Sequence, residues 1–279
     1  MANQPHSPLR FSVHVSTVIP CVDYLNNVKE GHTWSPISCT LVYSDSEAVL
    51  VITPITIDQT KDLIAWIEKV APGRKLSYIY VTHGHADHFL GVPQLVERFP
   101  EAVVLASRGT IYQIYKPLPN VDTFTPLPDN YEFKLQGRWT FRAIEVGHSD
   151  THDSTVLWVP DLKLAICGAV VYGEVHQNLF EANTKAKREE WIRAVERVEA
   201  LKPAYVVAGH RRPEDPDAAF HLAYTKKYLM DWGNLLKKSP SEPKELIDAM
   251  MKLYPNRFNP MVLFWGARGA FQVPESAGV

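Results

Sequence analysis

Cysteine is scarce in this sequence, and long apolar runs are missing from it. The three cysteines, Cys21, Cys39 and Cys167, are odd in number and far apart in the chain. Secreted disulfide-held domains carry many paired cysteines, so this usage predicts free thiols in a reducing compartment. A membrane helix needs about 18 apolar residues in a row, and a signal peptide needs a basic start and an apolar centre. Residues 1–20 have neither feature, and we expect a cytoplasmic protein with no membrane partner.

An excess of either charge is also lacking. The 29 Lys and Arg residues nearly balance the 31 Asp and Glu residues, which leaves a formal net charge of −2. Nucleic-acid-binding domains usually carry a clear basic excess, so we expect a small-molecule substrate and no nucleic-acid partner. With 279 residues, of which 46% are hydrophobic, the chain is long and apolar enough for a deep core. The composition leaves the oligomeric state open.

Predicted strands and helices alternate through much of the chain, which is typical of α/β layering. The residue patterns predict strands at 40–43, 48–52, 78–81, 102–105, 139–146, 155–159, 164–167 and 204–208, and helices at 58–70, 92–99, 187–201, 216–237 and 243–254. The proline-rich residues 117–128 are predicted to form a loop. No linker is apparent, so we expect one domain over residues 1–279. It would have an N-terminal arm or edge hairpin at about 1–36 and C-terminal helices at about 216–279.

The most informative stretch directly follows the strand predicted at 78–81. Residues 83–88, His-Gly-His-Ala-Asp-His, place three histidines and an aspartate in six consecutive positions. Gly84 and Ala86 allow His83 and His85 to project to one side while the following turn directs Asp87 and His88 elsewhere. Zinc binds imidazole nitrogens and carboxylate oxygens, and a catalytic site keeps one position for water. The loop can therefore serve two ions; the competing interpretation is a solvated loop that binds metal adventitiously.

The H-x-H-x-D-H spacing resembles that of metallo-β-lactamase-fold hydrolases, and the chain looks most like their small stand-alone members. The resemblance extends from about Leu41 to His210 and includes Gly91 and the pairs Gly147-His148 and Gly209-His210. It implies an α/β fold, namely a four-layer αββα sandwich. It also implies a hydrolase that uses a metal-bound hydroxide to open a lactone or lactam, or to cleave a small ester.

The same resemblance assigns ligands to two zinc ions. The first ion would be held by His83, His85 and His148, and the second by Asp87, His88 and His210. Asp87 would also orient the nucleophile and pass a proton to the leaving group, which makes it the catalytic residue. A histidine-rich set suits zinc, while iron and manganese stay open. For His148 or His210 taken alone, a hydrogen-bonded structural histidine is the competing interpretation.

One position departs from the family pattern. After the strand predicted at 164–167, family members place Gly-Asp, whose aspartate bridges the two ions, whereas this chain has Gly168-Ala169. An alanine methyl group cannot coordinate a metal, so we expect weaker occupancy of the second site and slower turnover. Natural divergence, a deliberate inactivating substitution, and a nearby carboxylate such as Asp150 or Glu174 in the bridging role are all open. The good fit of the surrounding sequence favours the inactivating substitution.

Two other functions compete with lactone or lactam hydrolysis. A glyoxalase-II-like thioesterase shares the ligand set and would hold glutathione or coenzyme A at a basic cluster. Candidates for that cluster are Arg211-Arg212, Lys226-Lys227 and Lys237-Lys238. A catalytically silent protein would bind metal and ligand without turnover, and Ala169 keeps this alternative open.

A substrate pocket is predicted only from residue type and position. Ligand pockets are mostly apolar with a few placed polar groups, and an apolar or aromatic substrate would suit aromatic walls. The aromatic candidates, which lie near the predicted ligand loops or in the C-terminal segment, are Phe89, Tyr172, Phe180, Phe264 and Trp265. His176 is a further candidate for the substrate cleft, and for each of these residues the competing role is in the core.

Overall fold

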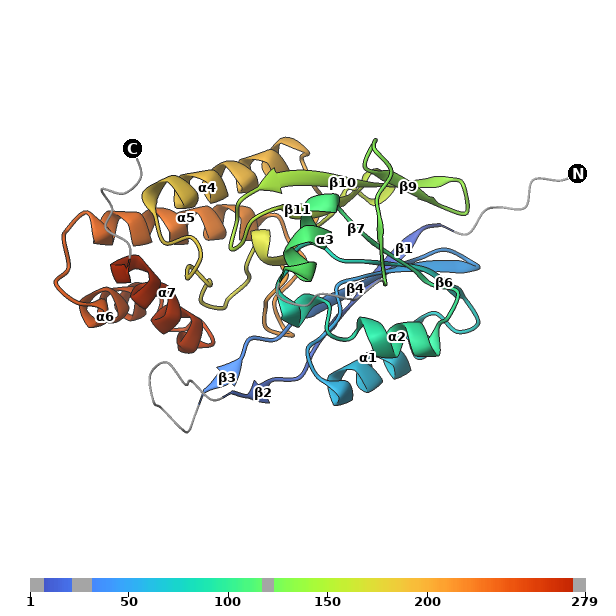
Figure 1. Cartoon of the computed structure of the whole chain (residues 1–279), viewed down its shortest axis with the longest axis horizontal. Coiled ribbons are helices and arrows are strands. Elements are labelled where there is room, and N and C mark those ends of the chain that lie inside the picture. Colours follow the sequence, from blue (N-terminus) through green and yellow to red (C-terminus); the bar gives the residue numbers. More distant parts are fainter. Residues whose placement is uncertain (1–7, 22–31, 117–122, 273–279) are drawn as a thin grey trace, which may run out of the picture.

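The computed structural model describes residues 8–21, 32–116 and 123–272. Two β-sheets lie against each other and carry helices on their outer faces (Figure 1). The N-terminal half of the chain forms the first sheet, in the order β1-β4-β5-β6-β7-β8. Its strands are β1 (Arg10–Val15), β4 (Ser38–Tyr43), β5 (Glu47–Val51), β6 (Lys75–Tyr80), β7 (Val103–Ala106) and β8 (Phe124–Pro126).

The first sheet is antiparallel from β1 to β5 and parallel from β5 to β8. Parallel neighbours need a crossover connection, and helices supply each one. The crossover helices are α1 (Ile57–Val70), α2 (Val92–Arg98) and α3 (Arg108–Tyr115). The parallel strands therefore end at one edge of the sheet, where the loop after β6 carries the histidines.

The second sheet comes from the C-terminal half, in the order β13-β12-β11-β10-β9. Its strands are β9 (Glu132–Leu135), β10 (Trp139–Gly147), β11 (Ser154–Val159), β12 (Leu164–Ile166) and β13 (Tyr205–Val207). Only the β12–β13 pair is parallel among these neighbours, and helix α4 (Lys185–Ala200) forms its crossover. The loops that follow β12 and β13 consequently leave the sheet side by side.

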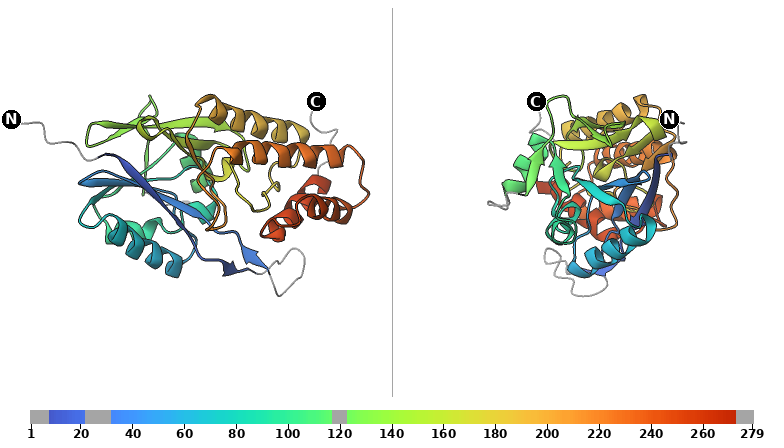
Figure 2. Two further views of the ribbon diagram at one scale, coloured as in Figure 1. Left: turned by 180° about the vertical axis from the view of Figure 1, so that it is seen from behind. Right: turned by 90° about the vertical axis from the view of Figure 1, so that its right-hand side faces the viewer.

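Helices α1 and α2 cover the first sheet, whereas α4 and α5 (Phe220–Leu236) cover the second (Figure 2). Helices α6 (Pro243–Leu253) and α7 (Pro260–Gln272) lie at one end of the molecule (Figure 1). This arrangement is the αββα sandwich, which confirms the predicted fold class. A two-stranded hairpin of β2 (Ile19–Pro20) and β3 (Thr33–Trp34) lies apart from both sheets. None of the helices in the described ranges combines the length and apolar character needed to cross a membrane.

Strand β11 contributes side chains to two hydrophobic cores, one on each face of the second sheet. Leu157 and Val159 belong to the core between the sheets, whereas Val156 and Trp158 belong to a second core that includes Trp191 of α4. Successive side chains of a strand point to opposite faces, so a sheet covered on both faces needs apolar residues at every position. All residues of β11 are accordingly buried.

Helix α1 begins where the sequence predicts it, and the cause is local. The Thr56 side chain accepts a hydrogen bond from the Gln59 backbone N–H, and the Gln59 side chain accepts one from the Thr56 backbone N–H. This reciprocal capping box satisfies two amide groups that the first helical turn leaves without partners. The helix then buries Leu63 and Ile67, as their spacing predicts.

Several segments differ from the sequence predictions, and helix α3 and strand β9 are among the elements that were not predicted. Residues 124–126, expected in a loop, form strand β8, while 117–122 lie outside the described residues. The helix expected from residue 216 begins at Phe220. Helix α7 was not predicted, because apolar residues occupy most of its circumference and leave no polar face to define a period.

Part of the predicted N-terminal arm belongs to the first sheet. Its residues 10–15 form β1, an edge strand of the first sheet that pairs with β4. Residues 1–7 and 22–31 of the arm, and residues 273–279 of the C-terminal region, lie outside the described part of the chain. No disulfide joins the cysteines within the described residues, and Cys39 and Cys167 are buried.

Candidate metal centre

The histidine loop is held tightly where it leaves β6. The Thr82 carbonyl accepts hydrogen bonds from the backbone N–H and the hydroxyl of Thr155 in β11, which ties the loop to the second sheet. Gly84 lies so close to α3 that a Cβ atom there would be 2.6 Å from the Cβ of Gln113. The glycine is therefore needed for this close approach, and the loop continues into a short 3₁₀ turn at Ala86–His88.

The first group of potential ligands contains His83, His85 and Asp150, whose donor atoms all lie within 4.8 Å of one another. His85 Nδ1 is 3.0 Å from Asp150 Oδ2, and His85 Nε2 is 3.1 Å from Glu181 Oε1. His83 Nδ1 contacts the Thr82 hydroxyl at 2.9 Å, so its Nε2 faces the group. The group therefore combines residues from the loop after β6 with one carboxylate from the loop after β10.

The second group contains Asp87, His88 and His210, which also have donor atoms within 4.8 Å of one another and are all buried. The Nε2 atoms of His88 and His210 are 3.0 Å apart. Asp87 Oδ2 lies 3.7 Å from His88 Nε2 and 3.6 Å from His210 Nε2. Because the Pro36 carbonyl can only accept, His210 donates to it through Nδ1 at 3.1 Å, which leaves Nε2 directed at the group.

Burial controls the protonation of these imidazoles. Desolvation by burial, with neighbouring histidines in addition, holds the pKa of His83 and of His88 well below its ordinary value. Burial also acts to lower the pKa of His85, but the carboxylates of Asp150 and Glu181 outweigh it and raise this pKa well above its ordinary value. Neutral imidazole is the form that binds metal. His83 and His88 are therefore already in the ligating state at neutral pH.

These residues fit divalent zinc. Within the described residues, His83 Nε2 is a buried polar atom without a hydrogen-bond partner. A buried polar atom without a partner is costly and needs an explanation, such as an ion. Two clusters of imidazoles with one carboxylate each match the nitrogen and oxygen donors that zinc prefers. Iron and manganese accept the same donor types.

His148 does not join the first group as the resemblance implies. It is buried, its ring centroid lies 4.4 Å from that of His152, and neither of its ring nitrogens has a partner among the described residues. Asp150, two positions further on, lies with His83 and His85 instead. The ligand role of His148 stays a prediction, and the two unpartnered nitrogens are compatible with it.

The backbone at Gly168 and Ala169 lies beside Gly209, the residue before His210, and Gly168 also lies near His83. A Cβ atom at Gly168 would be 3.4 Å from His83 Nδ1, and a Cβ atom at Gly209 would be 2.4 Å from the Gly168 carbonyl carbon and 2.9 Å from the Ala169 nitrogen. The loops after β12 and β13 thus touch backbone to backbone, and Ala169 itself is buried. Alanine supplies no ligand atom here, and Ala169 packs within the core that also contains Trp191.

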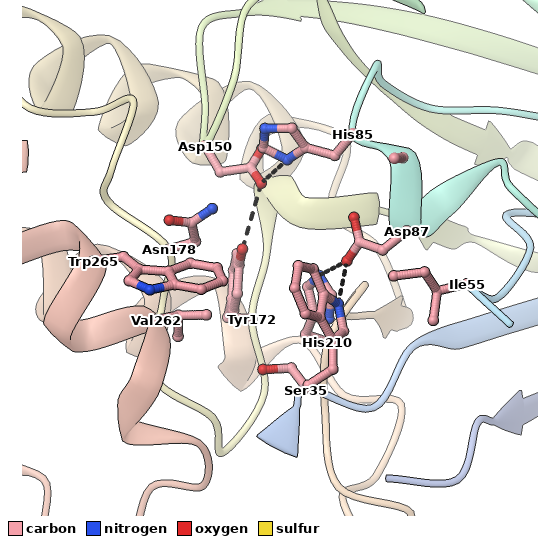
Figure 3. A pocket seen from close by; sticks show the side chains of 12 residues that line it. Ser35, Ile55, His85, Asp87, Asp150, Tyr172, Asn178, His210, Val262 and Trp265 are labelled. Atoms are coloured by element: carbon pink, nitrogen blue, oxygen red, sulfur yellow. Dashed lines mark hydrogen bonds and ion pairs between the residues drawn. The ribbon is translucent and has the colours of Figure 1, made fainter. Parts of the chain in front are cut away.

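A cavity of about 190 Å³ opens over both groups (Figure 3). His85 and Asp150 lie on one side of it and Asp87 and His210 on another, while Val262 and Trp265 of α7 form a facing wall. The lining residues are Trp34, Ser35, Ile55, His85, Ala86, Asp87, Asp150, Tyr172, Asn178, His210, Val262 and Trp265. His85 and Asp150 of the first group, and Asp87 and His210 of the second, are therefore accessible to a small molecule from a largely apolar cavity.

Two of the predicted pocket residues line this cavity, Tyr172 and Trp265. The Tyr172 hydroxyl donates to Asp150 Oδ2 at 3.4 Å, and burial together with Asp150 raises its pKa well above the ordinary value, so it stays protonated. The other residues that were predicted to form the pocket lie outside the cavity lining. Phe89 is buried in the core against Phe124, and Phe180 is exposed beside Gly269.

His176 and Phe264 also lie outside the cavity lining. His176 is fully buried and its Nδ1 is 2.9 Å from the Tyr228 hydroxyl. Phe264 lies on the side of α7 that faces His32, with ring centroids 6.1 Å apart. Adjacent positions on a helix point about 100° apart, so Trp265 reaches the cavity and Phe264 does not.

Several functional candidates were not identified from the sequence as pocket residues or ligands, although Asp150 was considered for the bridging role. Trp34 and Asn178 line the cavity, Asp150 joins the first group, and Glu181 contacts His85 while accepting a hydrogen bond from Thr151 at 2.7 Å. None of them follows a motif. Only Asp150 gave a signal, since it lies two positions after a predicted ligand.

Comparison with curated proteins finds relatives with several hydrolytic names. The chain is 27% identical over 169 residues to a type 2 metallo-beta-lactamase of Bacillus sp. (strain 170), covering 58% of this chain and 62% of the relative. It is 28% identical over 197 residues to a hydroxyacylglutathione hydrolase of Chromohalobacter salexigens, covering 70% and 66%. An atrochrysone carboxyl ACP thioesterase of Cryptosporiopsis sp. (strain 8999) is 33% identical over 119 residues, covering 42% and 33%. The matched part of this chain thus spans a third to two thirds of these relatives.

Solved structures with the same fold are metallo-beta-lactamases. The metallo-beta-lactamase from Pontibacter korlensis superposes with a TM-score of 0.60 at 20% identity, covering 80% of this chain and 99% of that one. The DIM-1 metallo-beta-lactamase exposed to ceftazidime gives a TM-score of 0.61 at 21% identity, with 82% and 99% covered. These likenesses establish the fold. The family model of the metallo-beta-lactamase superfamily matches residues 32–210, more than half of the chain, and the chain therefore belongs to that superfamily.

Proposed function

We propose that this chain is a zinc-dependent hydrolase that opens a lactone or lactam, or cleaves a small ester, with an apolar or aromatic group beside the reacting carbonyl. The observation that carries the proposal is the position of both ligand groups on the wall of one small, mostly apolar cavity. When bound there, two ions supply a water activated near neutral pH and polarise the carbonyl under attack. The relatives' names support hydrolysis and leave the substrate open.

Residues of the chain itself would orient the attacking water, protonate the leaving group and hold the metal ligands in position. The buried carboxylate of Asp87 faces His88 and His210 and lines the cavity, so it is placed to orient the attacking water and to carry its proton to the leaving group. Tyr172 holds Asp150, which in turn contacts His85, so the first group is kept in position by a neutral donor. No serine or cysteine nucleophile is required.

The walls of the cavity support a small uncharged substrate. Trp34, Ile55, Val262 and Trp265 present apolar surface, and the Asn178 amide and Ser35 hydroxyl offer hydrogen bonds. Typical drug-sized sites occupy about 300–1,000 Å³, which is larger than the 190 Å³ of this cavity. It therefore suits a small ring or the reacting end of a longer acyl chain.

Thioester hydrolysis is the second candidate, because two of the reported relatives carry names of that chemistry. Several of the basic residues considered for a glutathione or coenzyme A site already have partners. Arg211 pairs with Asp217 at 3.1 Å, Lys226 with Glu199 at 2.6 Å, and Lys227 with Asp231 at 2.5 Å. These ion pairs favour a thioester whose carrier is not held by these residues.

The deciding experiment compares the parent chain with Ala169→Asp and, as a control of equal size without the charge, Ala169→Asn. Metal content per chain is measured by elemental analysis, and hydrolysis is measured on a panel of lactones, lactams, esters and thioesters. The proposal expects about two ions and faster turnover in Ala169→Asp only. A parent and an Ala169→Asp variant that bind metal but hydrolyse nothing would favour the silent binding protein, and absence of metal from both would contradict the proposal.

A further inference from the structure

The short segment from Trp34 to Ile37 runs along the second ligand group and contacts two of its three members. The Trp34 indole N–H donates to Asp87 Oδ2 at 2.9 Å, and the Pro36 carbonyl accepts from His210 Nδ1 at 3.1 Å. Ile37 forms a β-bridge with His210. This segment connects the β2–β3 hairpin to β4, so it comes from the N-terminal region and not from any of the ligand loops.

The Trp34 indole donates its hydrogen bond to Oδ2, the oxygen of Asp87 that faces the two histidines. This carboxylate oxygen lies 3.7 Å from His88 Nε2 and 3.6 Å from His210 Nε2. A carboxylate can rotate about its terminal torsion with little preference, so nothing intrinsic to Asp87 fixes which oxygen faces the histidines. Within the described part of the chain, the indole is the neutral donor recorded for this carboxylate.

The indole ring itself is held from the other side. Trp34 is half-buried, and its ring packs edge to face against Trp265 of α7, with centroids 5.8 Å apart and planes at 64°. Edge-to-face aromatic pairs are favourable beyond the area they bury. The C-terminal helix therefore restrains the ring, the ring restrains Asp87, and both aromatic side chains also line the cavity.

We propose that Trp34 is a positioning residue, which holds Asp87 in the orientation that completes the second ligand group and so sets the affinity of the second ion. The inference deepens the proposed function and rests on it, because the role of Asp87 is part of that proposal. Hydrogen bonds to metal-ligating carboxylates typically affect metal affinity by 10- to 100-fold. The effect is assigned to the N–H group and not to the bulk of the ring.

The test uses Trp34→Phe, which removes the N–H and keeps an aromatic ring, with Trp66→Phe as the matched control. Trp66 lies on α1 against His14, away from the cavity. Zinc affinity is measured by competition with a chromophoric chelator, in the parent and in the Ala169→Asp background. Trp34→Phe should weaken the second binding step by about 10- to 100-fold and leave the first step unchanged, whereas Trp66→Phe should change neither. Equal affinities in Trp34→Phe and its background, or no second binding step in either background, would overturn the proposal.

A spectroscopic measurement keeps the proposal testable if Trp34→Phe is poorly folded. In the metal-free parent, the indole ¹H–¹⁵N signal of Trp34 should move when Asp87 is changed to Ala, while the other indole signals stay. An unmoved Trp34 signal would overturn the proposal independently of any activity. Weakened zinc binding in Trp34→Phe without hydrolysis by the parent or by Ala169→Asp would instead support the positioning role and contradict the hydrolase.

Discussion

The two halves of the sandwich contribute to the candidate centre in different ways. The N-terminal half supplies four ligand candidates from one uninterrupted loop after β6. The C-terminal half supplies Asp150 and His210, and carries Ala169 at the position of the family's bridging aspartate, on three separate loops after β10, β13 and β12. A continuous loop keeps its donors together by local geometry, whereas separate loops do so only when the sheet that carries them is correctly folded. The ligand positions in the C-terminal half should therefore be the more sensitive to substitution. Those in the N-terminal half should be easier to predict from the sequence.

Breaking the continuous loop should have the largest effect. His83→Ala removes a donor of the first group and should lower kcat/KM by roughly 10³-fold, because Lewis-acid activation contributes several kcal/mol and each 1.4 kcal/mol is tenfold. His152→Ala, an exposed histidine that belongs to neither ligand group, is the control. Both variants are compared on the substrate that the hydrolysis panel identifies. Equal loss in the two variants would mean that the loop is not the catalytic centre.

The C-terminal contribution to the first group can be tested by a pair of substitutions. Asp150 lies within the ligand group and His148 does not, so Asp150→Asn should weaken the first zinc ion by roughly 10- to 100-fold and His148→Asn by less. Chelator competition measures both affinities, and circular dichroism checks the fold. The opposite order would assign the ligand role to His148, as the family resemblance implies.

The C-terminal half also contains a buried histidine outside the centre, which should make stability depend on pH. Burial, aided by Arg257, lowers the pKa of His176 from 6.5 to about 3. Between pH 6.5 and pH 3, His176 is protonated in the unfolded chain but stays neutral in the folded chain. The free energy of unfolding is therefore highest above pH 6.5 and decreases as the pH falls towards 3, by up to about 1.4 kcal/mol per pH unit.

Urea unfolding of metal-free protein at pH 7 and pH 5 measures this dependence. His176→Gln, which keeps a hydrogen-bonding group for Tyr228, should show a smaller loss of stability between the two pH values than the parent. His14→Gln is the comparison from the N-terminal half, where burial lowers the pKa of a half-buried histidine. An unchanged pH dependence in His176→Gln would show that this histidine is not the cause.

The smallest expected difference lies between the caps of the two main covering helices. Thr56 forms a two-way capping box on α1, whereas Thr184 gives α4 a one-way side-chain cap. Replacement of either threonine by alanine should lower the free energy of unfolding by about 1 kcal/mol, with Thr56→Ala the more costly. Thermal and urea unfolding of both variants measure the difference. A larger loss in Thr184→Ala would mean that tertiary contacts, not the caps, decide these costs.

The fold and much of the centre could be predicted because their determinants are local. The spacing from His83 to His88 indicates candidate metal ligands, and the apolar period of α1 indicates its buried face. The mostly apolar run of β11 indicates a strand that is covered on both faces. His210 could be proposed because a glycine and a strand precede it. These signals lie within a few residues of the feature they predict.

The missed features depend on contacts between distant parts of the chain. Glu181 contacts His85 across 96 positions and Trp34 contacts Asp87 across 53. No local pattern distinguishes such a carboxylate or indole from one on any surface. Phe89 was predicted to line the cavity because it follows the histidine loop directly, but its ring packs in the core against Phe124.

The backbone contact between the loops that carry Gly168 and Gly209 has a consequence for engineering. Since no side chain separates the two loops, the conformation of each depends on the backbone of the other. A graft of the loop that carries His210 alone onto a foreign αββα scaffold would separate it from the backbone of Gly168, against which it packs. Residues 167–169 and 208–210 would have to be transplanted together, as one piece made of two strands' ends.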